Sequence, residues 1–221
     1  CWLNQSDDIM DTEKSNPQDT ETRILHAAEK EFMEKGYAGA RTTSIAERAG
    51  VTHAMLHYYF RTKDKLFERI VAGKLGMLGD IILSAIGDGE LPLEERIRQG
   101  VERHFDFIAA NSYLPRFIVN EVLTRPEHVE MMRRNAAQIA DSLLDNLQRE
   151  IDDYATKGLC RQVDARMLLI DIISLNVFPF IAYPVIEPIL GDLTADRERF
   201  FARRRAENTE VILRRLKKCD S

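Results

Sequence analysis

Residues 42–67, TTSIAERAGVTHAMLHYYFRTKDKLF, constrain the fold of this 221-residue chain more than any other stretch. Apolar residues recur there at helical spacing in two short runs, which predicts two short helices followed by the start of a third. Gly50, between the two runs, can adopt the positive φ that ends a helix, and the hydroxyl of Thr52 can cap the helix that follows. Two short helices joined by so tight a turn are typical of a helix-turn-helix, which places its second helix in a DNA major groove.

The two helices are expected to have an inward and an outward face. The residues expected to face inward are Ile45, Ala46, Ala49, Met55, Leu56 and Tyr59. The small side chain of Ala46 would let the two helices approach each other closely. The residues left outward on the second helix are His53, Ala54, His57 and Tyr58. This outward face is short, aromatic and basic, which suits entry into a major groove.

The net charge of −5 is unevenly distributed along the chain. Residues 20–75 carry a net charge of +3, whereas residues 1–19 carry −4 and residues 76–195 carry −8. Only local positive charge displaces the counterions of a phosphate backbone. Charge also fluctuates by chance along a solvated chain, but here the basic segment contains the helix-turn-helix, which favours DNA as its partner.

Helical spacing also recurs in the rest of the chain, and no alternating strand pattern competes with it. We therefore expect an all-α protein. The expected helices outside the helix-turn-helix span residues 19–35, 63 to the eighties, 93–113, 115–123, 127–154, 164–181 and 196–217. Gly87, Asp88 and Gly89 are expected to form the loop between the second and third of these helices.

Residues 172–186 carry no charge. A bilayer span needs about 20 apolar residues, and this run is shorter and contains Asn176, Pro179 and Pro184. We therefore expect no membrane helix here, but an apolar helix that is buried either in the core or by a partner. The three cysteines lie far apart, and the amino-terminal residues lack an apolar signal segment, which together favour a reducing cytoplasm.

The helix-turn-helix and its flanks resemble the amino-terminal domain of the TetR family of bacterial repressors. The residues that carry the resemblance are Ile24-Leu25-His26-Ala27-Ala28, Phe32, Lys35-Gly36-Tyr37, Ile45-Ala46, Ala49-Gly50-Val51 and Tyr59-Phe60-x-x-Lys63-x-x-Leu66-Phe67. They cover roughly residues 20–70 without a gap. The resemblance implies a homodimer whose two helix-turn-helix units meet successive major grooves of a palindromic operator, about 34–36 Å apart.

The resemblance also implies which residues contact DNA. It places Thr42 and Lys63 near phosphates, and it places Thr43, His53 and Ala54 at base edges. The complete expected set is Thr42, Thr43, Thr52, His53, Ala54, His57, Tyr58, Tyr59 and Lys63. Simpler alternatives are core packing for Tyr59 and plain solvation for Lys63. Position 57 is usually tyrosine in the family, so the phosphate contact of His57 stays open.

We expect a mobile tail at residues 1–18, a DNA-binding domain at 19–66 and an effector-binding and dimerisation domain at 67–221. The resemblance assigns dimerisation to residues 164–185 and 195–215, and a small-molecule pocket to the same domain. Candidate pocket residues are His104, Phe105, Ile108, Phe117, Met131, Asn135, Gln138, Phe178 and Tyr183. Aromatic residues at helical spacing also form ordinary core, whereas convergent polar groups would orient a ligand. Nothing in the sequence identifies that ligand.

A helical-bundle enzyme is the competing class of protein. A di-metal carboxylate site needs a glutamate three residues before a histidine, and none of the five histidines has one. The motifs H-E-x-x-H and G-x-S-x-G are also missing from the sequence. We therefore expect no catalysis, no metal and no cofactor.

The expected mechanism is repression that a small effector relieves. Effector binding would move the helix that begins at Lys63 and so change the spacing of the two recognition helices. The alternative is a DNA-binding dimer that responds to a protein partner through its basic last helix. The basic residues of that helix are Arg203, Arg204, Arg205, Arg214, Arg215, Lys217 and Lys218.

Overall fold

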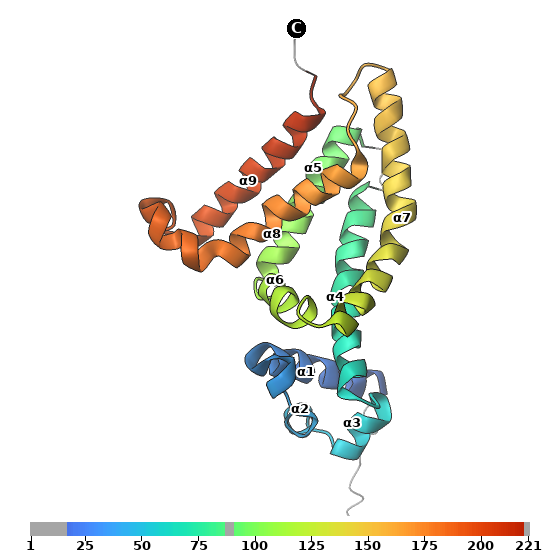
Figure 1. Cartoon of the computed structure of the whole chain (residues 1–221), viewed down its shortest axis with the longest axis vertical. Helices are drawn as coiled ribbons and strands as arrows, with labels where there is room; N and C mark the ends of the chain where they lie inside the picture. Colours follow the sequence, from blue (N-terminus) through green and yellow to red (C-terminus); the bar gives the residue numbers. More distant parts are fainter. Residues whose placement is uncertain (1–16, 87–90, 219–221) are drawn as a thin grey trace, which may run out of the picture. The chain divides into compact units, whose positions relative to one another are not determined.

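The computed structural model of the protein describes residues 17–86 and 91–218, and the side chains of residues 83, 85, 86, 135, 136 and 138–142 lie outside that description. The regular structure of the described residues is helical throughout, which confirms the all-α class. The helices are α1 Pro17–Gly39, α2 Thr42–Ala49, α3 His53–Tyr59, α4 Lys63–Ile86, α5 Leu93–Ala110, α6 Leu114–Phe117, the π-helix η1 Ile118–Val122, α7 Pro126–Thr156, α8 Ala165–Leu190, the 3-10 helix η2 Gly191–Leu193 and α9 Arg197–Leu216 (Figure 1). The expected loop at residues 87–89 lies outside the described residues.

The chain folds as two compact units, Cys1–Phe67 and Glu68–Ser221. Helix α4 begins in the first unit and continues into the second. In the first unit, the helices bury a small core around Ile24, Phe32, Ile45 and Leu56. The rings of Phe32 and Phe67 meet edge to face, with 5.3 Å between their centroids. Truncating a buried ring such as Phe32 to alanine typically costs about 3–5 kcal/mol of stability.

Glu31 is a buried carboxylate that joins α1 to α2. It accepts hydrogen bonds from Lys35 Nζ at 2.7 Å and Arg48 Nη2 at 3.4 Å, so its charge is compensated inside the domain. Arg48 also donates to Glu34 at 2.7 and 2.8 Å. Because a buried charge without partners is costly, these bonds make the α1–α2 packing specific.

Helix α1 differs from the expected span at both ends. It begins at Pro17, so Pro17 and Gln18 belong to a helix and not to the expected tail. Gly36, expected to end the helix, has a φ of 67° and interrupts the helical backbone. Helix α1 then continues for three more residues and ends at Gly39. The positive φ favours glycine because a side chain there would strain the backbone.

The second unit has a core shared by α5, α7, α8 and α9. Its fully buried side chains include Val101 of α5, Ile151 of α7, Leu168 of α8 and Ile212 of α9. Helices α5, α8 and α9 pack on one another (Figure 1). A second buried cluster in the same unit consists of Phe105 and four further residues.

Helix α8 is longer than its sequence predicts. Asp164 caps it by accepting from the backbone amides of Arg166 at 2.8 Å and Met167 at 2.9 Å, as expected for a helix that starts here. The helix continues past residue 181 to Leu190, because its prolines are accommodated inside it. The segment Ala165–Leu193 is long and apolar enough to cross a membrane by length and composition, and 22% of its most apolar window is buried within the chain.

Candidate nucleic-acid interface and ligand cavity

The turn between α2 and α3 has the geometry that its residue types predict. Gly50 adopts φ of 65° and ψ of 37°, and its amide donates to Glu47 O at 3.1 Å. The next amide, of Val51, donates to Ala46 O at 3.0 Å. The hydroxyl of Thr52 accepts from Met55 N at 3.1 Å and thereby caps α3. The turn and its cap are therefore confirmed.

Helix α3 presents a short outward face. His53, Ala54, His57 and Tyr58 are exposed on it, as expected from the sequence. The inward placement of Met55 was wrong, since this side chain is 42% exposed. Among the α3 residues only Leu56 is buried, and the next buried side chain is that of Phe60, four residues later and just past the helix end. A seven-residue helix has room for only one such inward row, and Tyr59 at its edge is half-buried.

A row of hydrogen bonds links the two helices on this outward face. Thr42 Oγ1 lies 3.0 Å from His53 Nε2, and His53 Nε2 lies 3.1 Å from His57 Nε2. His57 Nδ1 lies 3.2 Å from the carbonyl oxygen of Arg61, which can only accept. In the neutral His57 ring the hydrogen is therefore on Nδ1, and Nε2 accepts from His53 Nε2, whose single hydrogen is shared with Thr42 Oγ1. Three of the predicted DNA contacts are thus brought together in one row.

The predicted phosphate contacts gather at the start of α2. Arg41 is the N-cap residue of α2, and among the described residues its side chain makes no capping hydrogen bond. The first backbone amides of α2 can therefore donate to an anion. Lys63 Nζ donates to Ala40 O at 2.8 Å and lies 4.6 Å from the centre of the Tyr37 ring. The half-buried ammonium of Lys63 is therefore held within two residues of Thr42 and is not a plain solvated group. Thr43 is exposed in the first turn of the same helix.

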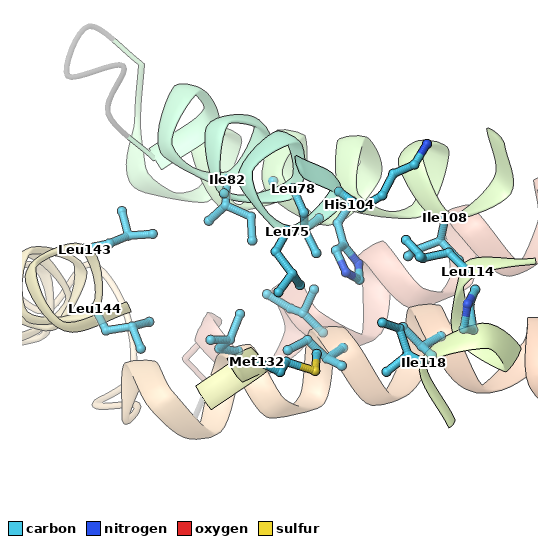
Figure 2. Close-up of a pocket in the computed structure, with 18 of the residues that line it drawn as sticks. Leu75, Leu78, Ile82, His104, Ile108, Leu114, Ile118, Met132, Leu143 and Leu144 are labelled. Carbon is cyan, nitrogen blue, oxygen red and sulfur yellow. The ribbon is translucent and has the colours of Figure 1, made fainter. Parts of the chain in front are cut away.

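The second unit contains a cavity of about 440 Å³ (Figure 2). This lies in the usual range for sites that hold small molecules. Its walls come from α4, α5, α6, η1, α7 and α8, and its aliphatic lining includes Leu75, Leu78, Ile82, Ile108, Leu114, Ile118, Met132, Leu143 and Leu144. Among the described residues that line it, only Lys74 and His104 have polar side chains. Such a lining suits an apolar ligand.

The cavity corrects the expected pocket. His104 and Ile108 line it, whereas five other candidates lie elsewhere, and the side chains of the remaining two, Asn135 and Gln138, lie outside the description. The five misplaced candidates are Phe105, Phe117, Met131, Phe178 and Tyr183.

The misplaced aromatic residues have structural roles of their own. The Phe105 ring packs 5.3 Å from that of Phe180, and Phe117 packs against the same cluster. Tyr183 donates its hydroxyl hydrogen to the carbonyl of Thr194 at 3.3 Å. Phe178 is 63% exposed.

The true lining has a helical spacing in the sequence that does not by itself identify a cavity. Met132 lines the cavity where its neighbour Met131 was expected, while Met131 is buried outside the cavity. Leu75, Leu78 and Ile82 recur at spacings of three and four along α4. That spacing alone is indistinguishable from an ordinary core stripe, because both bury aliphatic side chains on one helix face.

A buried polar network surrounds His104, and the sequence reasoning missed it. Asn176 Nδ2 of α8 lies 3.0 Å from His104 Nδ1 and donates to Val101 O at 2.9 Å. Asn208 Nδ2 of α9 donates to Asn176 Oδ1 at 3.0 Å and to Leu175 O at 2.8 Å. The signal was Asn176, an amide within the uncharged stretch of an apolar helix, since a buried amide needs partners.

Two family models match the chain. Residues 24–70 match the family described as bacterial regulatory proteins, tetR family, and residues 94–212 match the family described as tetracyclin repressor-like, C-terminal domain. The HTH-type transcriptional activator FasR of Mycolicibacterium smegmatis is 26% identical over 156 residues, which are 70% of this chain and 68% of FasR. The fatty acid metabolism regulator protein of Bacillus subtilis is 22% identical over 137 residues, which are 62% of this chain and 66% of that protein.

The fold also resembles solved structures. The fatty acid degradation regulator FadR of Bacillus halodurans superposes with a TM-score of 0.65 at 22% identity, covering 88% of this chain and 94% of FadR. At this identity the likeness shows a common fold.

Proposed function

The chain belongs to the TetR family of DNA-binding transcriptional regulators, and from this premise we propose that it binds a palindromic operator as a homodimer and is released by an apolar effector. The observation that carries the proposal is the course of α4. This helix has Lys63 in its first turn and lines the cavity with Leu75, Leu78 and Ile82. A ligand packed against the middle of α4 therefore acts on the same helix that carries a candidate phosphate contact.

At the operator, Thr43, His53 and Ala54 read base edges, and His57 and Tyr58 lie beside them. The exposure of these side chains on one face supports this assignment. His53 and His57 are hydrogen-bonded to each other in the free protein, so a base contact by His53 exchanges that bond for one to a base. The exchange keeps the His53 donor satisfied and makes the reading of the base specific.

Phosphate contacts come from the start of α2. Thr42, Lys63 and the uncapped amides of that helix form one anion-binding corner. Thr52 supports the recognition helix through its cap, and Tyr59 supports it through packing. These contacts fix the register of the protein on the duplex but carry no sequence information.

Dimerisation uses residues 164–185 and 195–215. The proposal is supported by large apolar side chains that α8 and α9 leave exposed in the single chain: Met167, Ile170, Ile173, Phe178, Val185, Ile189 and Val211. Large apolar side chains left exposed at helical spacing favour a surface that a partner covers. A second copy of the chain would bury it and place two recognition helices on one face of the duplex in the cytoplasm.

The effector is an aliphatic small molecule. Its support is the cavity lining, in which the described residues are aliphatic apart from Lys74 and His104. Two relatives are named for the metabolism or degradation of fatty acids, which favours an acyl chain as the occupant. The ligand releases DNA only if it fits one arrangement of α4 better than the other.

Gating by a protein partner through the basic last helix has no comparable support. Arg205 pairs with Glu102 at 3.2 Å and with Asp106 at 2.8 Å, and Arg215 pairs with Asp171. Arg203 and Arg204 both pair with Glu207, at 2.8 and 3.1 Å. These arginines are compensated within their own chain and do not form a free basic surface.

Selection of genomic DNA fragments by the purified protein, followed by sequencing, tests the proposed function. We expect enrichment of an inverted repeat whose half-sites are one helical turn apart, about 10 base pairs from centre to centre. The His53→Ala variant should retain fragments but lose part of this preference. Enrichment of fragments without any inverted repeat would contradict a dimeric operator complex.

A further inference from the structure

Among the described residues of the cavity wall, His104 is the one polar side chain with a hydrogen-bond donor that has no acceptor within the described chain. The other polar lining side chain, Lys74, donates to Asn111 Oδ1 at 3.1 Å and lies 5.9 Å from the centre of the Tyr113 ring. Its ammonium is therefore engaged by the protein itself. The His104 ring is almost fully buried and extends from α5 into the space beside Leu75 and Ile108 (Figure 2).

The surrounding carbonyl groups determine where the His104 hydrogen sits. Leu175 O accepts from Asn208, which fixes the orientation of that amide. Val101 O accepts from Asn176 and likewise fixes the second amide, so the group that faces His104 Nδ1 is an N–H. Nδ1 must therefore accept, and the hydrogen of the neutral ring is on Nε2.

The hydrogen on Nε2 is available inside the cavity. The described part of the chain gives Nε2 no acceptor, while Nδ1 is held by Asn176, and the residue lines the cavity. A buried donor without a partner is unfavourable, and an apolar cavity wall cannot supply one. A ligand oxygen that accepts this hydrogen would satisfy it.

We propose that the effector is an aliphatic molecule with one neutral oxygen acceptor, such as an acyl ester, thioester or amide carbonyl, which accepts from His104 Nε2. This inference rests on the proposed function and specifies its ligand. A carboxylate is a poorer partner for this site, because a neutral N–H does not compensate a full charge taken out of water. An alkane leaves the donor unsatisfied. The position of the oxygen along the aliphatic chain is thereby set by His104.

The neutral state of the ring agrees with this ligand class. Burial lowers the pKa of His104 to about 4, so the imidazole is uncharged at neutral pH. Among the described lining residues, the other titratable side chain of the cavity wall is that of Lys74.

Two substitutions separate the roles of the two ring nitrogens. In His104→Asn the amide oxygen can replace Nδ1 as the acceptor for Asn176, but no donor reaches the position of Nε2. In His104→Gln the longer side chain can place an N–H near Nε2, but the acceptor for Asn176 is lost. Both variants are polar and smaller than histidine, so each controls for the other.

Isothermal titration with methyl decanoate, decane and decanoate tests the inference. For the wild type we expect the ester to bind about tenfold more tightly than the alkane, with decanoate weaker than the ester. His104→Asn should abolish the preference for the ester, and His104→Gln should retain most of it.

The outcomes distinguish the ligand class from the proposed function. If all three probes bind the wild type equally, or if His104→Asn keeps the full preference, the assignment of His104 is overturned while an apolar effector cavity stands. If none of the probes binds, both the assignment and the effector role of the cavity are overturned.

Discussion

At the scale of single residues, the burial of His104 links the cavity to the stability of the protein. Its folded pKa of about 4 lies below the ordinary value of 6.5, because the charged imidazolium would be cut off from water. Between these two values the unfolded chain binds a proton that the folded protein does not. The stabilisation is therefore fully present above pH 6.5 and is lost as the pH falls towards 4.

We predict that this one group accounts for about 3 kcal/mol of the stability lost between pH 7 and pH 4. Urea unfolding at a series of pH values measures the loss. The His104→Asn variant, which has no titrating ring, should lose correspondingly less stability over the same range. Equal losses in the two proteins would show that His104 is charged in the folded state or is not buried as described.

Lys63 provides a second test at this scale. Lys63→Ala should weaken binding to all DNA sequences alike and lower the salt slope by about one unit, as expected for a phosphate contact. Lys63→Gln is the matched control, since its amide can still donate to Ala40 O but carries no charge. If the glutamine variant keeps the wild-type salt slope in anisotropy titrations, Lys63 supports the fold and does not contact phosphate.

At the scale of elements, the helix caps at positions 50, 52 and 164 were the most predictable features. Glycine at position 50 and hydroxyl or carboxylate groups at Thr52 and Asp164 act on the nearest backbone atoms, so the local sequence specifies them. The end of α8 was not predictable in this way, because packing decides whether a helix continues past Pro184. The same limit applies to Met55, whose exposure depends on which side of a very short helix the rest of the domain covers.

Glycine substitutions should show opposite effects in the turn and in a helix. Gly50→Ala should lower stability by about 1–2 kcal/mol, because φ at this position is 65° and alanine is strained there. Steric overlap does not contribute, since the atom nearest to the new Cβ is 3.8 Å away. Gly76→Ala should raise stability by up to about 1 kcal/mol, because this position is helical and open. Denaturant titrations measure both, and a neutral Gly50→Ala would contradict the left-handed turn.

At the scale of the whole molecule, the sequence predicted the all-α class and the order of the helices, but not the cavity. Helical periodicity identifies which residues are buried. A cavity depends instead on where several helices pack incompletely against one another, which periodicity does not show. This is why Phe105 and Tyr183, chosen as pocket residues, belong to the core, and why Leu78 and Leu144 were missed.

The proposed dimer gives a prediction at this scale. Phe178→Asp should convert the protein to monomers, because association would bury an unpaired carboxylate at a cost of several kcal/mol, roughly 3–5. Leu159→Asp is the control, since Leu159 is also apolar and 65% exposed but lies outside α8 and α9. Sedimentation velocity distinguishes the species. A wild type that is monomeric at micromolar concentration, or two variants that behave alike, would contradict the assigned interface.

The most direct test of the account measures the affinity of the selected operator with and without methyl decanoate, by fluorescence anisotropy. The account predicts that the ligand weakens operator binding at least about fivefold, and that the operator weakens ligand binding by the same factor, because the coupling is reciprocal. A ligand that binds the cavity and leaves operator affinity unchanged, or increases it, would contradict release through α4.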